Sequence, residues 1–529
     1  MSDHMEISSL FESMDFKEKQ YSEVKYIQVN DQTPGQYDSG SVIFDTMPHR
    51  SHFSVLSESY LVLTGEILNA TADSKYAVKS SILSFIQGLT VESSSGSTIV
   101  NEIQGSTSIV ANLKLMLDSA LDFRDANELH FAGHDKHISA NVMRDLSIVG
   151  GASPTLSDKV PTIDPAHNPP LANRIIAWMN SSQKIHVNAG VYTQPFLVYI
   201  PLKFIHSWFA QMDWPCNNMP FKLTFNIAGT GGFTSMFPLV CPESKAHMTL
   251  GSVDAPVVPD VADPADATKL DVTKGATYLK SHHAAAAGAA AKPQIALGTP
   301  TNERGFATGV RLYLKTVKFH AEEAKKVAAM MTKGFDKKIE FNTSVFHRIP
   351  IRPGVPMPKY ELSTQQVGAS FIRPQRIWVL PVLADTLASE KNSFPSVISS
   401  KGQYLTNFNL TLGGENFYSG NIRSQYEFYR LLREQMVGEG QSLMWNTPIT
   451  YTEFLNGVNP YCFDVSRSPL IDSNAAVDLT ITTDIAMPPG VDVPDIDLIV
   501  IVERVETHAM NISTGGVVHT TVKGEAKLA

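Results

Sequence analysis

Histidines are the first residues in this chain whose type and spacing suggest chemistry. His130, His134 and His137 lie close together in the stretch "HFAGHDKH", and imidazole is a common ligand of Zn²⁺. The stretch lacks the glutamate of the HExxH motif, and turn-forming residues surround it. A solvated loop therefore explains these histidines better than a metal site does.

The other motifs that accompany catalysis are weak or missing. The glycine-rich stretch "GTGGF" (229–233) is not followed by the Lys-Ser/Thr of a strand-to-helix phosphate loop. His282 and His283 stand beside an alanine tract and are interpreted as a surface feature. There is no GxSxG elbow, and no spacing implies a catalytic pair of carboxylates. We therefore predict no enzyme, with no catalytic, cofactor-binding or metal-binding residue and no cofactor.

Composition narrows the class of protein further. Cys216, Cys241 and Cys462 form no CxxC pair, which favours a reducing compartment over a disulfide framework or a zinc site. The net charge of −9 argues against a general nucleic-acid binder, because affinity for phosphate comes from clustered Lys and Arg. The N-terminus has no secretory pattern, and no apolar run approaches the roughly 20 residues that span a bilayer. We expect a soluble product made in a cytosol.

The stretch from Gln194 to Ala228 shows the elements on which any site must be built. "PFLVYIPL" is a continuous apolar run, as expected of a strand covered on both faces. Later in the stretch Phe221, Leu223, Phe225 and Ile227 alternate with polar residues, which is typical of a half-buried strand. Two such strands joined by aromatic residues and a turn predict a packed β sandwich.

The chain of 529 residues exceeds what one hydrophobic core usually serves, so two large β domains are expected. Both halves show the same order of signals, with strands, a helix, an apolar strand, an alternating strand and a final strand. An order of signals is weaker evidence than a sequence repeat, and a single large all-β protein with two helices is the alternative. The predicted elements of the first half are strands at 41–46, 59–68, 84–93, 184–190, 195–202, 221–227 and 309–320, with a helix at 107–121. Those of the second half are strands at 337–351, 376–383, 405–417, 461–470, 475–487 and 495–506, with a helix at 424–436.

The boundaries follow from shifts in composition. Residues 229–305 are rich in Pro, Asp and Ala and are far longer than an ordinary loop. They predict an exposed projection, with a disordered linker as the alternative. The predicted division is an N-terminal arm (1–37), a first β domain (38–320) that carries this insertion, a helical connector (321–336), a second β domain (337–523) and a C-terminal tail (524–529).

Taken in order, four stretches resemble the double jelly-roll major capsid proteins of double-stranded DNA viruses, most of all those of polinton-like viruses and virophages. They are "SVIFDTMPHRSHFSVLSESYLVLTGEI", "FLVYIPLKFIHSWFAQMDWPCNNMPFKLTFNIA", "LTNFNLTLGGENFYSGNIRSQYEFYRLLREQM" and "DIDLIVIVERVETH". The resemblance spans about residues 38–523 and lies in order and length, without an invariant motif. It implies an all-β fold of two consecutive eight-stranded antiparallel jelly rolls with short helices and a long loop insertion.

The resemblance also implies a structural role. Three chains would form a pseudo-hexameric capsomer that tiles an icosahedral shell, so the partners are the protein itself, neighbouring capsomers, and penton and minor capsid proteins. An internal membrane under the shell would be a further partner, with the arm on the inner face and the 229–305 insertion projecting outward. The location implied is the virion shell, assembled inside the host cell, and no sequence-specific contact with nucleic acid is implied.

Two other functions use the same kind of fold. The first is a tandem jelly-roll carbohydrate-binding, lectin-like protein, which would need exposed aromatic platforms. The tryptophans stand mostly in apolar contexts, which predicts core packing for most of them: Trp178, Trp208, Trp214, Trp378 and Trp445. The second is a cupin-type metalloenzyme, whose paired His/Glu motif is absent from the sequence.

Overall fold

The computed structural model describes the strands, the helices and part of the loops. The described residues are 21–32, 40–49, 51–70, 77–78, 82–93, 96–102, 106–118, 186–188, 191–217, 220–227, 239–240, 262–263, 266–270, 294–297, 310–333, 336–352, 359–371, 374–383, 404–436, 451, 454, 460–466, 477–486, 495–511 and 517–519.

The first half of the chain forms two antiparallel sheets that share one core. One sheet has the order β1 (Tyr21–Asn30), β14 (Arg311–Phe319), β3 (Phe53–Ala70), β8 (Val191–Pro201) and β7 (His186–Asn188), and β13 (Gln294–Leu297) pairs with β3. The other sheet has the order β2 (Gly40–Asp45), β9 (Phe221–Ile227), β5 (Ile86–Ser93) and β6 (Thr98–Glu102).

The second half forms another pair of antiparallel sheets. One has the order β15 (Asp336–Ile351), β22 (Ile496–Asn511), β17 (Pro374–Leu383) and β20 (Tyr461–Asp464), and β23 (Val517–His519) pairs with β22. The other has the order β16 (Lys359–Phe371), β21 (Val477–Ala486), β18 (Tyr404–Leu412) and β19 (Glu415–Asn416).

The two halves repeat one topology. If the eight main strands of each half are numbered in chain order, both halves have one sheet in the order 1-8-3-6 and a second in the order 2-7-4-5. In each half a helix follows the fifth strand: α3 (Ser106–Asp118) after β6, and α11 (Gln425–Met436) after β19. This is the eight-stranded jelly roll built twice, so the predicted all-β double jelly-roll fold is confirmed.

Shorter elements connect these strands. They are the 3-10 helices η2 (Met47–His49) and η3 (Ile82–Phe85), the one-turn helices α7 (Leu202–Ile205) and α8 (Ser207–Gln211), the helix α10 (Ala321–Lys333) between the two jelly rolls, and the short pairs β4 (Ala77–Val78) with β10 (Leu239–Val240) and β11 (Ala262–Asp263) with β12 (Asp266–Leu270). Among the described residues no helix is both long and apolar enough to cross a membrane.

The apolar patterns of the sequence occupy the cores. In β9 the residues Phe221, Leu223 and Phe225 are buried while Lys222 between them is exposed, as period-two alternation requires. Trp208, Trp214 and Trp378 are also buried, which confirms core packing for these three; Trp178 and Trp445 lie outside the described residues.

One part of the predicted arm is wrong. Tyr21–Asn30 forms β1, which pairs with β14 over its whole length and is therefore the first strand of the first jelly roll. It escaped the sequence analysis because it is an edge strand: only Val29 is fully buried, and Glu23 and Lys25 are exposed. Charged residues are common on such strands because they discourage pairing with other chains. The remaining domain boundaries stay predictions.

The predicted insertion is described only in part. Within 229–305 the structure describes β10, β11, β12 and β13. β13 pairs with the C-terminal half of β3, from Gly65 to Leu68, which also pairs with β8. The last strand of the insertion therefore belongs to the first sheet. Whether the insertion projects from the molecule stays a prediction.

Candidate functional site between the two jelly rolls

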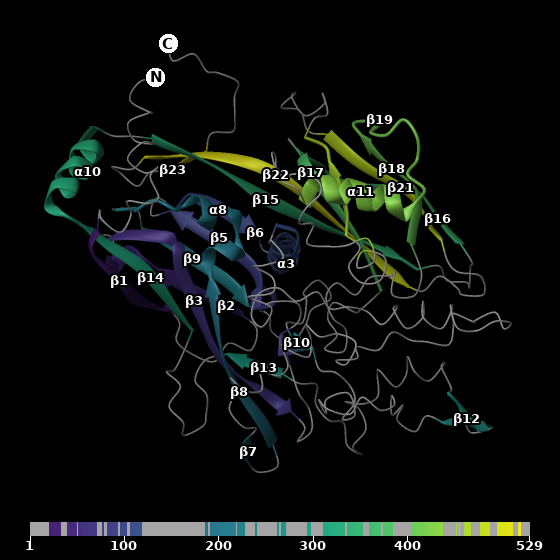
Figure 1. Cartoon of the computed structure of the whole chain (residues 1–529), viewed down its shortest axis with the longest axis horizontal. Coiled ribbons are helices and arrows are strands. Elements are labelled where there is room, and N and C mark those ends of the chain that lie inside the picture. The colour runs from purple at the N-terminus through teal and green to yellow at the C-terminus, as the bar shows by residue number, and fades with distance from the viewer. Residues whose placement is uncertain are drawn as a thin grey trace.

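The two jelly rolls lie against each other, and each contributes side chains to the other's core. Figure 1 shows β15 and β22 running from the second jelly roll across α8 of the first. Ile339, Phe341 and Met510 of the second jelly roll belong to the first hydrophobic cluster. In return, α3 of the first jelly roll places Ile109, Val110 and Leu113 in the second cluster. This exchange joins the two sandwiches into one packed body.

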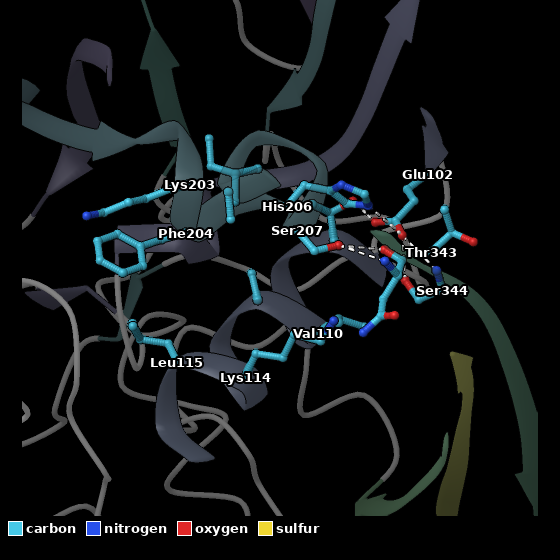
Figure 2. A pocket seen from close by; sticks show the side chains of 15 residues that line it. Glu102, Val110, Lys114, Leu115, Lys203, Phe204, His206, Ser207, Thr343 and Ser344 are labelled. Atoms are coloured by element: carbon cyan, nitrogen blue, oxygen red, sulfur yellow. Dashed lines mark hydrogen bonds and ion pairs between the residues drawn. The ribbon is translucent and has the colours of Figure 1, made fainter. Parts of the chain in front are cut away.

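A buried carboxylate lies at the centre of this junction. Glu102, the last residue of β6, is 4% exposed. Its Oε1 accepts hydrogen bonds from the backbone N–H and the hydroxyl of Ser344 on β15, both at 2.8 Å. Its Oε2 accepts one from the hydroxyl of Thr107 at 3.1 Å. A side chain of the first jelly roll is thus bonded directly to the backbone of the second (Figure 2).

His206 completes the polar cluster from the same jelly roll as Glu102. Its Nδ1 accepts a hydrogen bond from the backbone N–H of Trp208 at 3.1 Å, which caps α8. An acceptor role for Nδ1 puts the ring proton on Nε2, and Nε2 lies 3.3 Å from Oε1 of Glu102. The imidazole therefore donates to the carboxylate and holds the start of α8 at the junction.

The environment of Glu102 keeps its carboxyl group ionised. Burial alone raises the pKa of a carboxyl group. Here the imidazole of His206 and the two donors of Ser344 outweigh burial and lower the pKa of Glu102 from 4.5 to about 2. The carboxylate is therefore charged at neutral pH, and its charge is satisfied by hydrogen bonds.

Further polar contacts cross the junction on either side of Glu102. The hydroxyl of Ser207 on α8 donates to the backbone carbonyl of Asn342 at 2.9 Å and accepts from its N–H at 3.0 Å. The ammonium group of Lys114 on α3 lies 3.3 Å from Oε1 of Glu503 on β22, whose side chain is 1% exposed. A buried carboxylate needs such a partner, because an unpaired charge in a protein interior is strongly destabilising.

A cavity of about 490 Å³ opens beside these contacts. It is lined by α3, by the segment from Lys203 to Ser207 and by Asn342 to Ser344 of β15. Figure 2 shows Glu102, His206 and Ser344 grouped at one end, and Lys203 and Phe204 at the other. The cavity therefore has a polar end within the junction and an amphipathic end away from it.

Glu102, His206 and Ser344 are residue types that form a catalytic triad, but their arrangement differs from one. In a triad the imidazole bonds to the serine hydroxyl and takes its proton. Here the Ser344 hydroxyl donates to Glu102, and both ring nitrogens of His206 have other partners. The imidazole does not contact the serine hydroxyl, and a carboxylate with a pKa of about 2 is a weak base for activating it. The contacts of the cluster join the two jelly rolls instead.

The residues that the sequence analysis weighed for chemistry are not among the described residues of this junction. His130, His134, His137, the stretch 229–233, His282 and His283 lie outside the described residues, as does Cys241. Cys216 and Cys462 are buried and are not in disulfide bonds. Within the described part of the chain, no group of three His, Cys, Asp or Glu side chains is arranged to hold a metal ion.

Sequence reasoning did not single out the junction residues. His206 and Ser207 interrupt the apolar stretch "FIHSWF", which marks them as polar groups that need partners when buried. Nothing in the sequence names the partner of His206, because Glu102 lies 104 residues earlier in the chain. Ser344 lies 242 residues after Glu102 and in the other jelly roll.

Comparison with known proteins gives a structural match but no sequence match. No family model matches the chain, and neither does any curated protein. Among solved structures, a chain from the cryo-EM structure of the Sputnik virophage matches with a TM-score of 0.52 and 10% identity, covering 94% of this chain and 88% of that one. The mavirus major capsid protein matches with a TM-score of 0.50 and 12% identity, covering 94% and 90%. At these identities the likeness concerns the fold, and nearly the whole chain shares the double jelly-roll fold of the mavirus major capsid protein.

Proposed function

We propose that this protein is a major capsid protein whose trimers form pseudo-hexameric capsomers of an icosahedral shell. The observation that carries the proposal is the junction: two jelly rolls of identical strand order are joined by exchanged core residues and by the buried Glu102 cluster. A shell subunit needs stiff walls at fixed angles, and a junction of this kind supplies them. The fold shared with the mavirus major capsid protein supports the same role.

The proposal extends to the partners and the location. Copies of the chain and neighbouring capsomers would be the main partners, with penton and minor capsid proteins at the vertices and on the inner face, and with a membrane beneath the shell as a further candidate. The protein would be found in the virion after assembly inside the host cell. Trp208, Trp214 and Trp378 are buried, so these three rings are not the exposed aromatic platforms that the lectin-like alternative needs.

The mass of the purified protein in solution tests the proposal. Sedimentation velocity is expected to give a species near three times the chain mass of 57.9 kDa, and negative-stain images are expected to show hexagonal particles. A protein that remains monomeric at every concentration measured would contradict a capsid role. Negative-stain images that show only elongated single chains would contradict it too.

A further inference from the structure

The junction inside the chain is formed by particular elements of each jelly roll. Because the two jelly rolls share one topology, each also contains the counterparts of the other's junction elements. Inside the chain, the helix after the fifth strand of the first jelly roll (α3) meets the first and eighth strands of the second (β15 and β22). The counterparts of these elements are α11 in the second jelly roll and β1 with β14 in the first. Within the described residues α11 does not pack on β1 or β14.

The junction buries one face of α3, and the corresponding face of α11 is exposed. Ala111 and Leu115 of α3 pack in the core of its own jelly roll, as Phe428 and Leu432 of α11 do in theirs. Matching the helices on these pairs aligns two buried α3 residues, Ile109 and Leu113, with two exposed α11 residues, Tyr426 and Arg430. Tyr426 is 61% exposed. The face of α11 that corresponds to the buried face of α3 is therefore exposed at these two positions.

The strands show the same contrast. Ile339 and Phe341 on β15 are each 2% exposed, because they pack into the first jelly roll. On β1, the equivalent first strand, Val24 is 48% exposed and Tyr26 is 50% exposed. Large apolar residues at such exposure on adjacent positions of one strand face are typical of an interaction surface.

Tyr26 belongs to a row of tyrosines that crosses the outer face of this sheet, here called the tyrosine face (Tyr26, Tyr60, Tyr199 and Tyr313). The ring of Tyr60 lies 5.4 Å from that of Tyr26, 5.1 Å from that of Tyr313 and 6.0 Å from that of Tyr199. The guanidinium group of Arg311 lies over the ring of Tyr313. A sheet face turned to water is usually polar, whereas tyrosine and arginine are enriched where proteins bind each other.

We propose that α11 of one copy docks on the tyrosine face and β1 of a second copy, so that the contact inside the chain is repeated between chains. The proposal rests on the proposed function and names the surfaces through which the copies meet. Two different surfaces of the same chain make the contact heterologous. A ring of three copies then has six jelly rolls and six related junctions, three within chains and three between them.

Charge-bearing substitutions on both surfaces test the contact. Tyr26→Glu and Tyr426→Glu are each expected to convert the trimer to monomer in sedimentation velocity, because the contact would lose an aromatic ring and would have to bury a hydrated carboxylate. Both side chains are exposed in one chain, so the thermal unfolding of the monomeric chain is expected to change little. Met47→Glu is the matched control, since Met47 is 41% exposed but lies on η2 and belongs neither to the tyrosine face and β1 nor to α11, and this variant is expected to remain trimeric.

Cross-linking then tests the pairing itself. A chain carrying both Tyr26→Cys and Tyr426→Cys is treated with a short bismaleimide and run on a denaturing gel. The double variant is expected to give covalent dimers and trimers, whereas each single variant stays monomeric. The described native cysteines, Cys216 and Cys462, are buried, and the wild-type chain under the same treatment measures any background.

The outcomes separate this proposal from the function on which it rests. A wild-type trimer that withstands both glutamate substitutions and yields no cross-link in the double variant overturns the surfaces while leaving the capsid role intact. Efficient cross-linking of the Tyr26→Cys single variant would show a self-complementary contact and also overturn the proposal. A wild-type chain that is monomeric throughout would instead contradict the proposed function.

Discussion

Glu102 shows how a single side chain sets the relation of two large domains. Its carboxylate accepts hydrogen bonds from Thr107 and His206 of its own jelly roll and from Ser344 of the other. A charged acceptor with several donors has no good substitute, because any replacement leaves some of these buried donors without a partner.

Glu102→Gln is expected to lower the free energy of unfolding by about 2–4 kcal/mol, since the amide turns a donor toward groups that are themselves donors. Urea unfolding of the two proteins measures the difference. Glu92→Gln is the matched control, because Glu92 pairs with Lys222 at 3.1 Å with a side chain 32% exposed, and exposed ion pairs contribute about 1 kcal/mol or less. Equal losses in both variants would argue against a special role for the junction.

The lowered pKa of Glu102 makes this contribution depend on pH. A carboxyl group whose folded pKa lies below its unfolded value stabilises the folded state above the unfolded pKa, and the contribution is lost as pH falls toward the folded value. The gap in unfolding free energy between wild type and Glu102→Gln should therefore be constant above about pH 5 and shrink between 4.5 and about 2. Urea titrations at a series of pH values follow the gap. A gap that stays constant down to pH 2.5 would contradict the assigned pKa.

At the scale of elements, α3 belongs to the cores of both jelly rolls while α11 belongs to one. Leu113 of α3 is fully buried in the second core, although its helix is part of the first jelly roll. Removing part of the Leu113 side chain should therefore destabilise both jelly rolls.

Leu113→Ala is expected to cost about 2–5 kcal/mol, the usual range for removing a buried leucine side chain. The measurement is chemical unfolding followed by tryptophan fluorescence, with Trp208→Phe and Trp378→Phe versions of the chain used to assign the signals of the first and second jelly rolls. Tyr426→Ala on α11, assayed as monomer, is the control and should change stability by less than about 0.5 kcal/mol. If only the Trp378 signal shifted, the two cores would be separable.

The clearest strand patterns in the sequence belong to strands inside sheets, although the edge strands β2, β15 and β20 were predicted as well. The apolar run of β8 and the alternation of β9 gave clear patterns because both strands have neighbours on each side. β1, β6 and β16 were missed, and all three are edge strands of their sheets. An edge strand packs less of its surface, so its sequence carries charges and polar residues instead of a clear period. The junction could not be predicted because its residues lie 104 and 242 positions apart in the sequence and meet only in the folded chain.

At the scale of the whole molecule, the shared cores predict that the chain unfolds as one unit. Calorimetry should give a single transition for the monomeric Tyr426→Glu variant, with the calorimetric enthalpy equal to the van't Hoff enthalpy. For the wild-type protein the midpoint should rise with concentration, as for any assembly that binds only folded chains. Two resolved transitions in the monomer would mean that the jelly rolls fold independently.

The helix α10, which links the jelly rolls, has mostly exposed residues and few neighbours beyond β14. The two jelly rolls are held together by the side chains that each packs into the core of the other. Cleavage of the backbone within this helix would therefore leave the two fragments associated. The covalent link serves to deliver the two sandwiches in equal numbers, and their mutual orientation does not depend on it.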